Sequence, residues 1–220
     1  MKKSINNILS LLLVFSNLSF FALSESFSSE NPIVLPPSDD DNIVLPEIFD
    51  NDGDPIRIGM TYIIKNPFIG GGAVYLGNIG HLKCPNAVLQ HASIPGFMGN
   101  GTAVMFVRDD DSDDGDVVRE TTRVYIDFVV KTTRLCVNET VWKVNDELIV
   151  VTGGKVGNED DIFKIMTTEI VTQDYKHVYK LLYCPPYVMC NAIGVTFKDE
   201  HFRLVTVDDQ HFVPFVFFKA

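Results

Sequence analysis

The stretch Ile48–Ile56 reads Ile-Phe-Asp-Asn-Asp-Gly-Asp-Pro-Ile, and after five further residues comes Tyr62-Ile63-Ile64. It places a run of Asp, Asn and Gly between two apolar groups. Asp and Asn side chains bond to the nearby backbone and Gly adopts positive φ without steric cost, so such runs favour tight turns. The stretch therefore predicts a strand, a turn and a second strand.

The same pattern continues from Ile43 to the C-terminus. Short apolar or alternating runs are separated by clusters of Gly, Asn, Asp and Pro, and no helical period is sustained. We therefore expect about a dozen strands in an all-β barrel or sandwich, because crossover helices for a doubly wound α/β fold are missing. The clearest expected strands are 61–64, 73–76, 104–107, 124–130, 141–144, 148–151, 163–166, 178–182, 193–197, 202–207 and 212–218.

The first 24 residues have the organisation of a secretory signal peptide. Lys2 and Lys3 precede the apolar run 8–21, and Ala22-Leu23-Ser24 has small residues at the positions that a signal peptidase requires. The apolar run is shorter than the roughly 20 residues of a membrane span, which argues against an N-terminal anchor helix. We predict cleavage after Ser24 and entry into the secretory pathway.

Residues 25–43 are polar and Pro-rich, and we interpret them as an extended leader in front of one domain at 44–220. Hydrophobic residues make up 46% of the chain, enough for that domain to bury a full core. Cleavage removes Lys2 and Lys3 and no acidic residue, so the net charge changes from −11 to −13. Such a charge repels nucleic acids and anionic membranes, and we exclude both as partners.

The four cysteines, Cys84, Cys136, Cys184 and Cys190, are read as two disulfides in an oxidising compartment. Three pairings exist; the short spacing favours Cys184 with Cys190, which leaves Cys84 with Cys136. A zinc site is the alternative for four cysteines, but no CxxC pair is present. We expect no metal site.

The sequence lacks the motifs of the common enzymes. GxSxG, HExxH, the P-loop and GxGxxG are absent, and the cysteines assigned to disulfides leave no thiol nucleophile. The acidic run 109–116 resembles a calcium loop only in part, because counting from Asp110 the twelfth position is Thr121 instead of Glu. We interpret it as a solvated turn, and we expect neither an enzyme nor a cofactor.

The opening stretch at 48–64 resembles the N-terminal signature of the Kunitz soybean-type inhibitor family, and later segments agree with it in the same order. These are 71–77, Leu135-Cys136-Val137 with Trp142-Lys143-Val144, 152–157, 163–165, 179–185 and 193–195. The resemblance covers 44–220 and is greatest to the potato-type and miraculin-like branch. It implies a β-trefoil, a six-stranded closed barrel capped by three hairpins, with the first cysteine paired to the second and the third to the fourth.

The leader carries a resemblance of its own. Residues 31–36, Asn-Pro-Ile-Val-Leu-Pro, are similar to a plant vacuolar sorting signal, although a plain extended leader would have the same composition. We therefore expect a vacuolar or extracellular protein. Its partner would be a secreted or vacuolar endopeptidase, and we expect the inhibitor to act as a monomer.

The family resemblance implies an inhibitor that inserts an exposed, substrate-like loop into an endopeptidase, and it places this loop at 99–107. The residue that would fill the primary specificity pocket matches Ala103, with Val104 next; some potato-type relatives point to Met105. None of these is Arg or Lys, so the resemblance implies a serine protease target other than trypsin. Val104, Met105 and Phe106 can also be plain strand residues, which is our preferred interpretation of Phe106.

Several departures from the family pattern favour an alternative. Ile58 stands where the family has an Asn that braces the loop, and an isoleucine side chain offers no hydrogen bond. Asn100 and Asn138 begin glycosylation sequons, the first inside the expected loop. The alternative is a non-inhibitory storage, defence or ligand-binding trefoil; a cysteine or aspartic protease bound through another loop is a further option.

Overall fold

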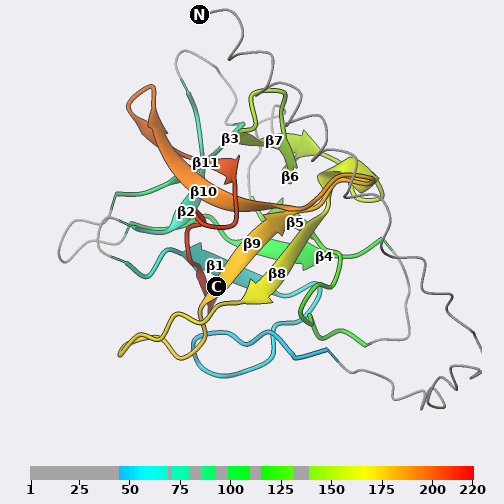
Figure 1. Ribbon diagram of the computed structural model, residues 1–220, viewed down its shortest axis with the longest axis vertical. Coiled ribbons are helices and arrows are strands. Elements are labelled where there is room, and N and C mark those ends of the chain that lie inside the picture. The colour runs from blue at the N-terminus through cyan, green and yellow to red at the C-terminus, as the bar shows by residue number, and fades with distance from the viewer. Residues whose placement is uncertain (1–44, 69–70, 80–85, 93–98, 110–114, 131–138) are drawn as a thin grey trace, which may run out of the picture. The chain divides into compact units, whose positions relative to one another are not determined.

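The structure is a computed structural model, which describes residues 45–68, 71–79, 86–92, 99–109, 115–130 and 139–220 (Figure 1). The chain divides into two units, residues 1–43 and 44–220. The first, with the predicted signal peptide and leader, lies outside the described residues, and the description that follows concerns the second.

The all-β prediction is confirmed, with twelve strands in one sheet and a single short 3-10 turn, η1, among the described residues. No helix of the described residues is long and apolar enough to cross a membrane. The strands are β1 (Thr61–Lys65), β2 (Val74–Gly77), β3 (Ala87–Gln90), β4 (Val104–Val107), β5 (Tyr125–Phe128), β6 (Val141–Val144), β7 (Val150–Gly154), β8 (Phe163–Thr167), β9 (Tyr179–Tyr183), β10 (Asn191–Lys198), β11 (His201–Val207) and β12 (Val216–Lys219), with η1 at Glu159–Asp161.

Six strands form a ring of neighbours. Antiparallel ladders join β12 to β1, β1 to β4, β4 to β5 and β8 to β9. Single bridges provide the two other links: Val124, just before β5, pairs with Phe163 in β8, and Tyr179 in β9 pairs with Phe215, just before β12. The strands β8 and β9 cross the front of the molecule side by side in Figure 1.

The other six strands are three antiparallel hairpins, β2 with β3, β6 with β7, and β10 with β11. The β10–β11 hairpin is the long one at the upper left of Figure 1. Strand β3 also pairs with β7 and β11, so the three hairpins are hydrogen-bonded to one another. Six strands in a ring plus three hairpins are the elements that the family resemblance implies.

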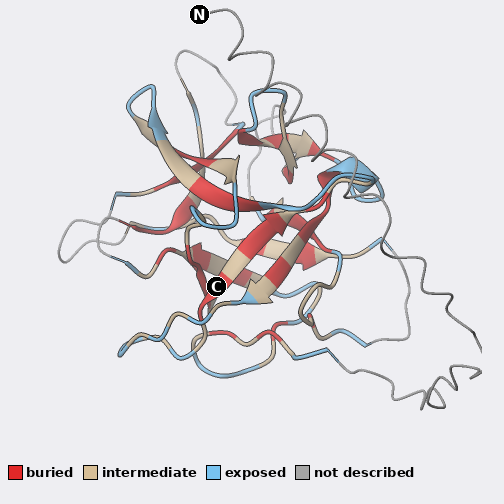
Figure 2. Ribbon diagram, in the orientation of Figure 1, coloured by how far each residue is buried: buried red, intermediate tan, exposed pale blue. Residues whose placement is uncertain are grey.

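The core lies inside the ring, where the buried segments of the strands face one another (Figure 2). Successive side chains of a strand point to opposite faces of the sheet, and this places every second residue in the core. Strands β1 and β4 show this pattern. Aromatic rings fill the space, with Trp142 packed between Phe128 at 5.4 Å and Phe163 at 6.0 Å between ring centroids. Apolar burial on this scale is the main stabilising term of the fold.

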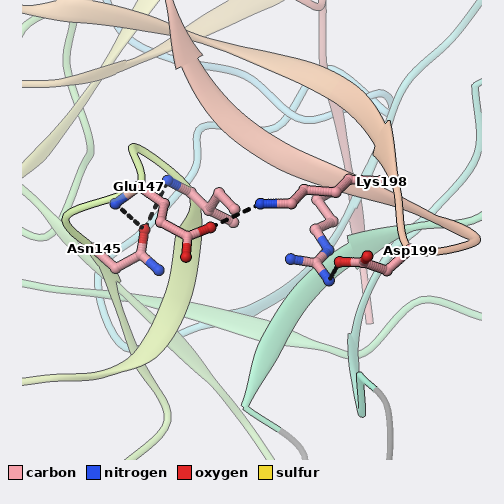
Figure 3. Close-up of polar contacts among 6 residues, drawn as sticks. Asn145, Glu147, Lys198 and Asp199 are labelled. Carbon is pink, nitrogen blue, oxygen red and sulfur yellow. Dashed lines mark hydrogen bonds and ion pairs between the residues drawn. The ribbon is translucent and has the colours of Figure 1, made fainter.

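The tips of two hairpins meet through charged side chains (Figure 3). Asn145 turns the β6–β7 hairpin by accepting hydrogen bonds at Oδ1 from the backbone N–H of Glu147, at 3.1 Å, and of Ile149, at 2.9 Å. Lys198, from β10, then reaches the Glu147 carboxylate at 2.8 Å, and this contact lowers the pKa of Glu147. Because both side chains are exposed, we take the pair as a weak link between hairpins.

Candidate functional site

The segment expected to form the reactive loop, Ala103 to Phe106, lies mainly in β4. Val104 and Phe106 are completely buried, whereas Met105 and Ala103 are partly exposed. Tyr62 of β1 lies opposite Val104 on one side, and β5 pairs with the whole of β4 on the other. The Ala103 carbonyl also accepts a hydrogen bond from Val129 N–H, at 2.8 Å.

Val104 and Phe106 are therefore buried strand residues, whereas the family resemblance implies an exposed, substrate-like loop at this segment. Their side chains point into the core, and Phe106 packs against Tyr62 and Phe217, with ring centroids 5.9 and 5.6 Å away. Neither residue could enter a protease cleft unless β4 separated from its neighbours. The strand interpretation of Phe106 agrees with this placement, and Ala103 and Met105 are left as the accessible members of the segment.

The residues just before β4 are held by the sheet. Thr102 accepts a hydrogen bond at Oγ1 from Leu76 N–H and donates its own N–H to the Val74 carbonyl, both at 3.0 Å. His91 stacks on Tyr75 at 3.9 Å, and its Nε2 bonds to the Asn100 carbonyl at 3.3 Å. These contacts brace the segment, although the sequence has Ile58 in place of the Asn that braces the loop in the family.

Ile58, at the position of the family's bracing Asn, contributes apolar packing instead of a hydrogen bond from its side chain. Its partly buried side chain packs against the hydrophobic core. Its backbone N–H donates to the Asp116 carbonyl at 2.7 Å. The positions that hold the segment, His91 and Thr102, carry no motif that would have identified them from sequence.

The predicted disulfide between Cys184 and Cys190 is present, with an S–S distance of 2.08 Å. Cys84 and Cys136 lie outside the described residues, as does the second sequon residue, Asn138. Asn100 is described, and its exposed side chain makes that sequon accessible to glycosylation.

The loop closed by this disulfide is the other candidate site. It connects β9 to β10 and exposes three consecutive large side chains: Tyr187 completely, Val188 at 63% and Met189 at 87% of full exposure. The loop itself consists of Pro185-Pro186-Tyr187-Val188-Met189, enclosed by the two cysteines whose short spacing predicts the disulfide. No signal in the sequence indicates this exposure, because apolar residues are more often buried.

A hollow of about 230 Å³ lies at the base of this loop and includes Cys184 and Pro186 in its wall. Its rim is charged, with Arg123 and Glu159 forming an ion pair at 3.5 Å. Among the described residues, the lining consists of Arg123, Glu159, Ile162, Lys164, Cys184 and Pro186.

The described residues contain no cluster of side chains that could bind a metal ion. No three His, Cys, Asp or Glu side chains of these residues lie close enough together to hold a metal ion. Most of the acidic run 109–116, at 110–114, lies outside the described residues. The accessible candidates for contact with a partner are Ala103 and Met105, which are partly exposed, and the exposed tip of the disulfide loop.

Comparison with known proteins identifies relatives over the whole domain. A family model described as trypsin and protease inhibitor, of the Kunitz legume type, matches residues 48–219. Cysteine protease inhibitor 8 of Solanum tuberosum is 64% identical over 217 residues, which cover 97% of this chain and 98% of the relative. Cysteine protease inhibitor 1 of the same species is 65% identical over 222 residues, 99% of this chain and 100% of the relative.

Solved structures agree with the sequence relatives. The Kunitz-type cysteine protease inhibitor PCPI-3 from potato has a TM-score of 0.67 at 34% identity, with 80% of this chain and 98% of that chain covered. The soybean trypsin inhibitor has a TM-score of 0.63 at 24% identity, over 79% of this chain and 99% of that chain, and shows the fold alone. The β-trefoil expectation is thereby confirmed.

Proposed function

The chain belongs to the Kunitz family of trypsin and protease inhibitors, and on that premise we propose that its target is a cysteine endopeptidase. It is a protease inhibitor of Kunitz type and not an enzyme. The family model alone does not discriminate between protease classes, so the class rests on the arguments that follow.

The names of the relatives support the cysteine class. Two proteins that are 64% and 65% identical along almost their entire length are both named cysteine protease inhibitors. At this identity about two thirds of the aligned positions carry the same residue.

The burial of Val104 is the structural observation that carries the proposal. A serine protease inhibited through the expected loop would need the residues on both sides of the scissile bond to lie in its cleft. Here the residue after Ala103 points into the core and is paired on both sides. This geometry disfavours the expected serine protease mechanism and favours binding through another surface.

A serine protease other than trypsin is the second candidate. Ala103 and Met105 are partly exposed, and the contacts of Thr102 and His91 hold the preceding segment in one conformation. A rigid segment loses little entropy on binding, which is the property an inhibitory loop requires.

Titration of the purified mature protein against five proteases tests the proposal. The panel consists of papain for the cysteine class and trypsin, chymotrypsin, elastase and subtilisin for the serine class. We expect stoichiometric inhibition of papain, unchanged when N-glycans are removed. Inhibition of chymotrypsin or elastase, but not of papain, would show that the target is a serine protease. If none of the five is inhibited, both candidate classes fail.

We also propose that the protein follows the secretory pathway to the vacuole or the cell exterior. The positive residues Lys2 and Lys3, the apolar run 8–21 and the sorting-signal-like residues 31–36 support this route. Sequencing the N-terminus of the protein isolated from its source tests the first step, since cleavage after Ser24 makes Glu25 the first residue.

A further inference from the structure

We propose that the loop between Cys184 and Cys190 is the part of this inhibitor that enters its target protease, with Tyr187, Val188 and Met189 at the tip. This inference rests on the proposed function, because it assigns a surface to the inhibition of a cysteine endopeptidase. It names a loop on the connection from β9 to β10, away in sequence from the segment that the family resemblance indicates.

Exposure of the tip is the first argument. Among the described residues, large apolar side chains exposed to solvent occur singly except here, where Tyr187, Val188 and Met189 are consecutive. Tyr187 is completely exposed and Met189 is 87% exposed. Single exposed apolar side chains are ordinary, whereas a contiguous apolar surface marks a binding site. Tyrosine, in addition, is one of the residues that contribute most to protein interfaces.

Rigidity of the loop is the second argument. The disulfide holds the ends of a five-residue segment with their Cα atoms 4.3 Å apart. Below it the Cys184 N–H donates to the Ile162 carbonyl at 3.0 Å, and Tyr183 pairs with Asn191 across β9 and β10. Pro185 and Pro186 fix two φ angles in the ascending arm. A loop held in this way loses little conformational entropy when it binds.

The backbone at the tip adds a further observation. Tyr187 has a φ of 62°, in the left-handed region that residues other than Gly rarely adopt. This conformation reverses the chain and directs the tyrosine ring outward, where it contacts solvent instead of the protein. Unusual backbone conformations that the surrounding structure maintains are concentrated at functional sites.

The charge pattern indicates what the tip would contact. No charged residue occurs between Lys180 and Lys198, in a mature chain whose net charge is −13. Inserting the tip into an apolar pocket of a protease cleft would therefore bury no charge, which avoids a large desolvation cost. Arg123, Lys164 and Glu159 surround the base of the loop, where they would form the polar rim of the contact.

Inhibition by this route requires no covalent step. The tip fills an apolar subsite of the active-site cleft, and the body of the trefoil then blocks access of substrate to the catalytic thiol of the protease. Binding would therefore compete with substrate and be reversible. This route would therefore not require the peptide bond between Ala103 and Val104 to reach the catalytic residues of the protease.

The test compares the doubly substituted protein Tyr187→Asp/Met189→Asp with the wild type in papain inhibition. Placing two carboxylates at the tip should weaken inhibition at least 30-fold, about the effect of removing a single hot-spot residue. Val171→Asp is the matched control, because Val171 is 94% exposed on a different loop. It should inhibit like the wild type, within about twofold, as expected of a surface site outside the contact.

A second variant separates rigidity from apolar contact. Cys184→Ser/Cys190→Ser keeps the tip residues but removes the staple, and we expect inhibition to weaken about tenfold because the loop must then be ordered on binding. Fluorescence of Trp142, which lies in the core, reports whether each variant is folded. Only variants with the wild-type spectrum are compared.

The outcomes distinguish this inference from the proposed function. If the wild type inhibits papain and the tip variant inhibits it equally well, the loop assignment is wrong and the proposed function stands. If the wild type inhibits only a serine protease, the proposed function fails, and the same variants assayed on that protease support or overturn the loop assignment. A wild type that inhibits neither class overturns both.

Discussion

Asp50 is a completely buried carboxylate in the turn with which the domain begins. Its Oδ1 accepts hydrogen bonds from the backbone N–H groups of Asp52 and Asp54, both at 3.0 Å. Its Oδ2 lies 3.6 Å from Lys219 Nζ, near the C-terminus. The side chain therefore stabilises the turn and also forms an ion pair that links the N-terminal turn of the domain to its last strand.

Replacing Asp50 by Ala should lower the free energy of unfolding by about 2 kcal/mol, because two hydrogen bonds to a charged acceptor are lost. Asp54→Ala is the control, since Asp54 also pairs with Lys219 but is mostly exposed. We expect the control to unfold close to the wild type, as exposed ion pairs contribute little. Urea unfolding followed by Trp142 fluorescence measures both, and equal losses would contradict the role given to Asp50.

The titration of Tyr179 makes the free energy of unfolding fall as the pH rises in the alkaline range. Burial raises its pKa to about 12 from an ordinary value of 10.0, although the hydrogen bond that its hydroxyl accepts from Phe49 N–H acts in the opposite direction. Between these two pH values the unfolded chain has lost the proton that the folded protein retains. The folded state then binds more protons, so its stability falls as the pH rises through this range.

Tyr179→Phe removes this titration. At neutral pH the variant should be less stable by about 1 kcal/mol, because the Phe49 N–H loses its acceptor. Its stability should then decline less steeply than that of the wild type between pH 10 and 12. Urea unfolding at a series of pH values gives the two curves, and parallel curves over this range would rule out Tyr179 as the group responsible.

Strand β4 can be tested as an element of the core. Phe106→Ala should cost about 3–5 kcal/mol of stability, the usual loss for a buried phenylalanine. Met105→Ala, at the partly exposed neighbouring position, should cost clearly less. Urea denaturation distinguishes the two placements. If Phe106→Ala unfolds at the same urea concentration as the wild type, the residue lies in a loop and not in the core.

Most elements were predictable because their residues carry the strand pattern locally. The predicted bounds 104–107 and 141–144 agree with β4 and β6. Strand β3 (Ala87–Gln90) was missed, since all four of its residues are buried and show no alternation. It is buried because it pairs with β2, β7 and β11, a property of the assembled sheet that four residues cannot encode.

The candidate site was less predictable than the strands, for a similar reason. Whether Val104 ends a loop or begins a strand depends on its pairing with Tyr62 and Phe128, which lie far away in the sequence. For the disulfide loop, cysteine spacing indicated the staple correctly. The exposure of Tyr187 could not be derived from spacing, because it depends on which surfaces lie around the connection from β9 to β10.

The domain as a whole should fold without its leader. Leu45 is the first described residue, and its carbonyl accepts a hydrogen bond from Arg119 at 3.1 Å. The Pro46 carbonyl accepts one from Glu120 N–H at 2.8 Å, and Glu47 forms an ion pair with Arg119 at 2.9 Å. Residues 45–47 therefore attach this end of the domain to the segment 119–120.

We predict that a protein beginning at Val44 has the same melting temperature as one beginning at Glu25. A protein beginning at Ile48 is the control: it lacks residues 45–47, so it should melt several degrees lower, at about 2–4 °C for each kcal/mol lost. Scanning calorimetry of the three proteins measures this. A lower melting temperature for the protein beginning at Val44 would show that the leader stabilises the domain. Equal values for all three would show that the contacts of residues 45–47 do not.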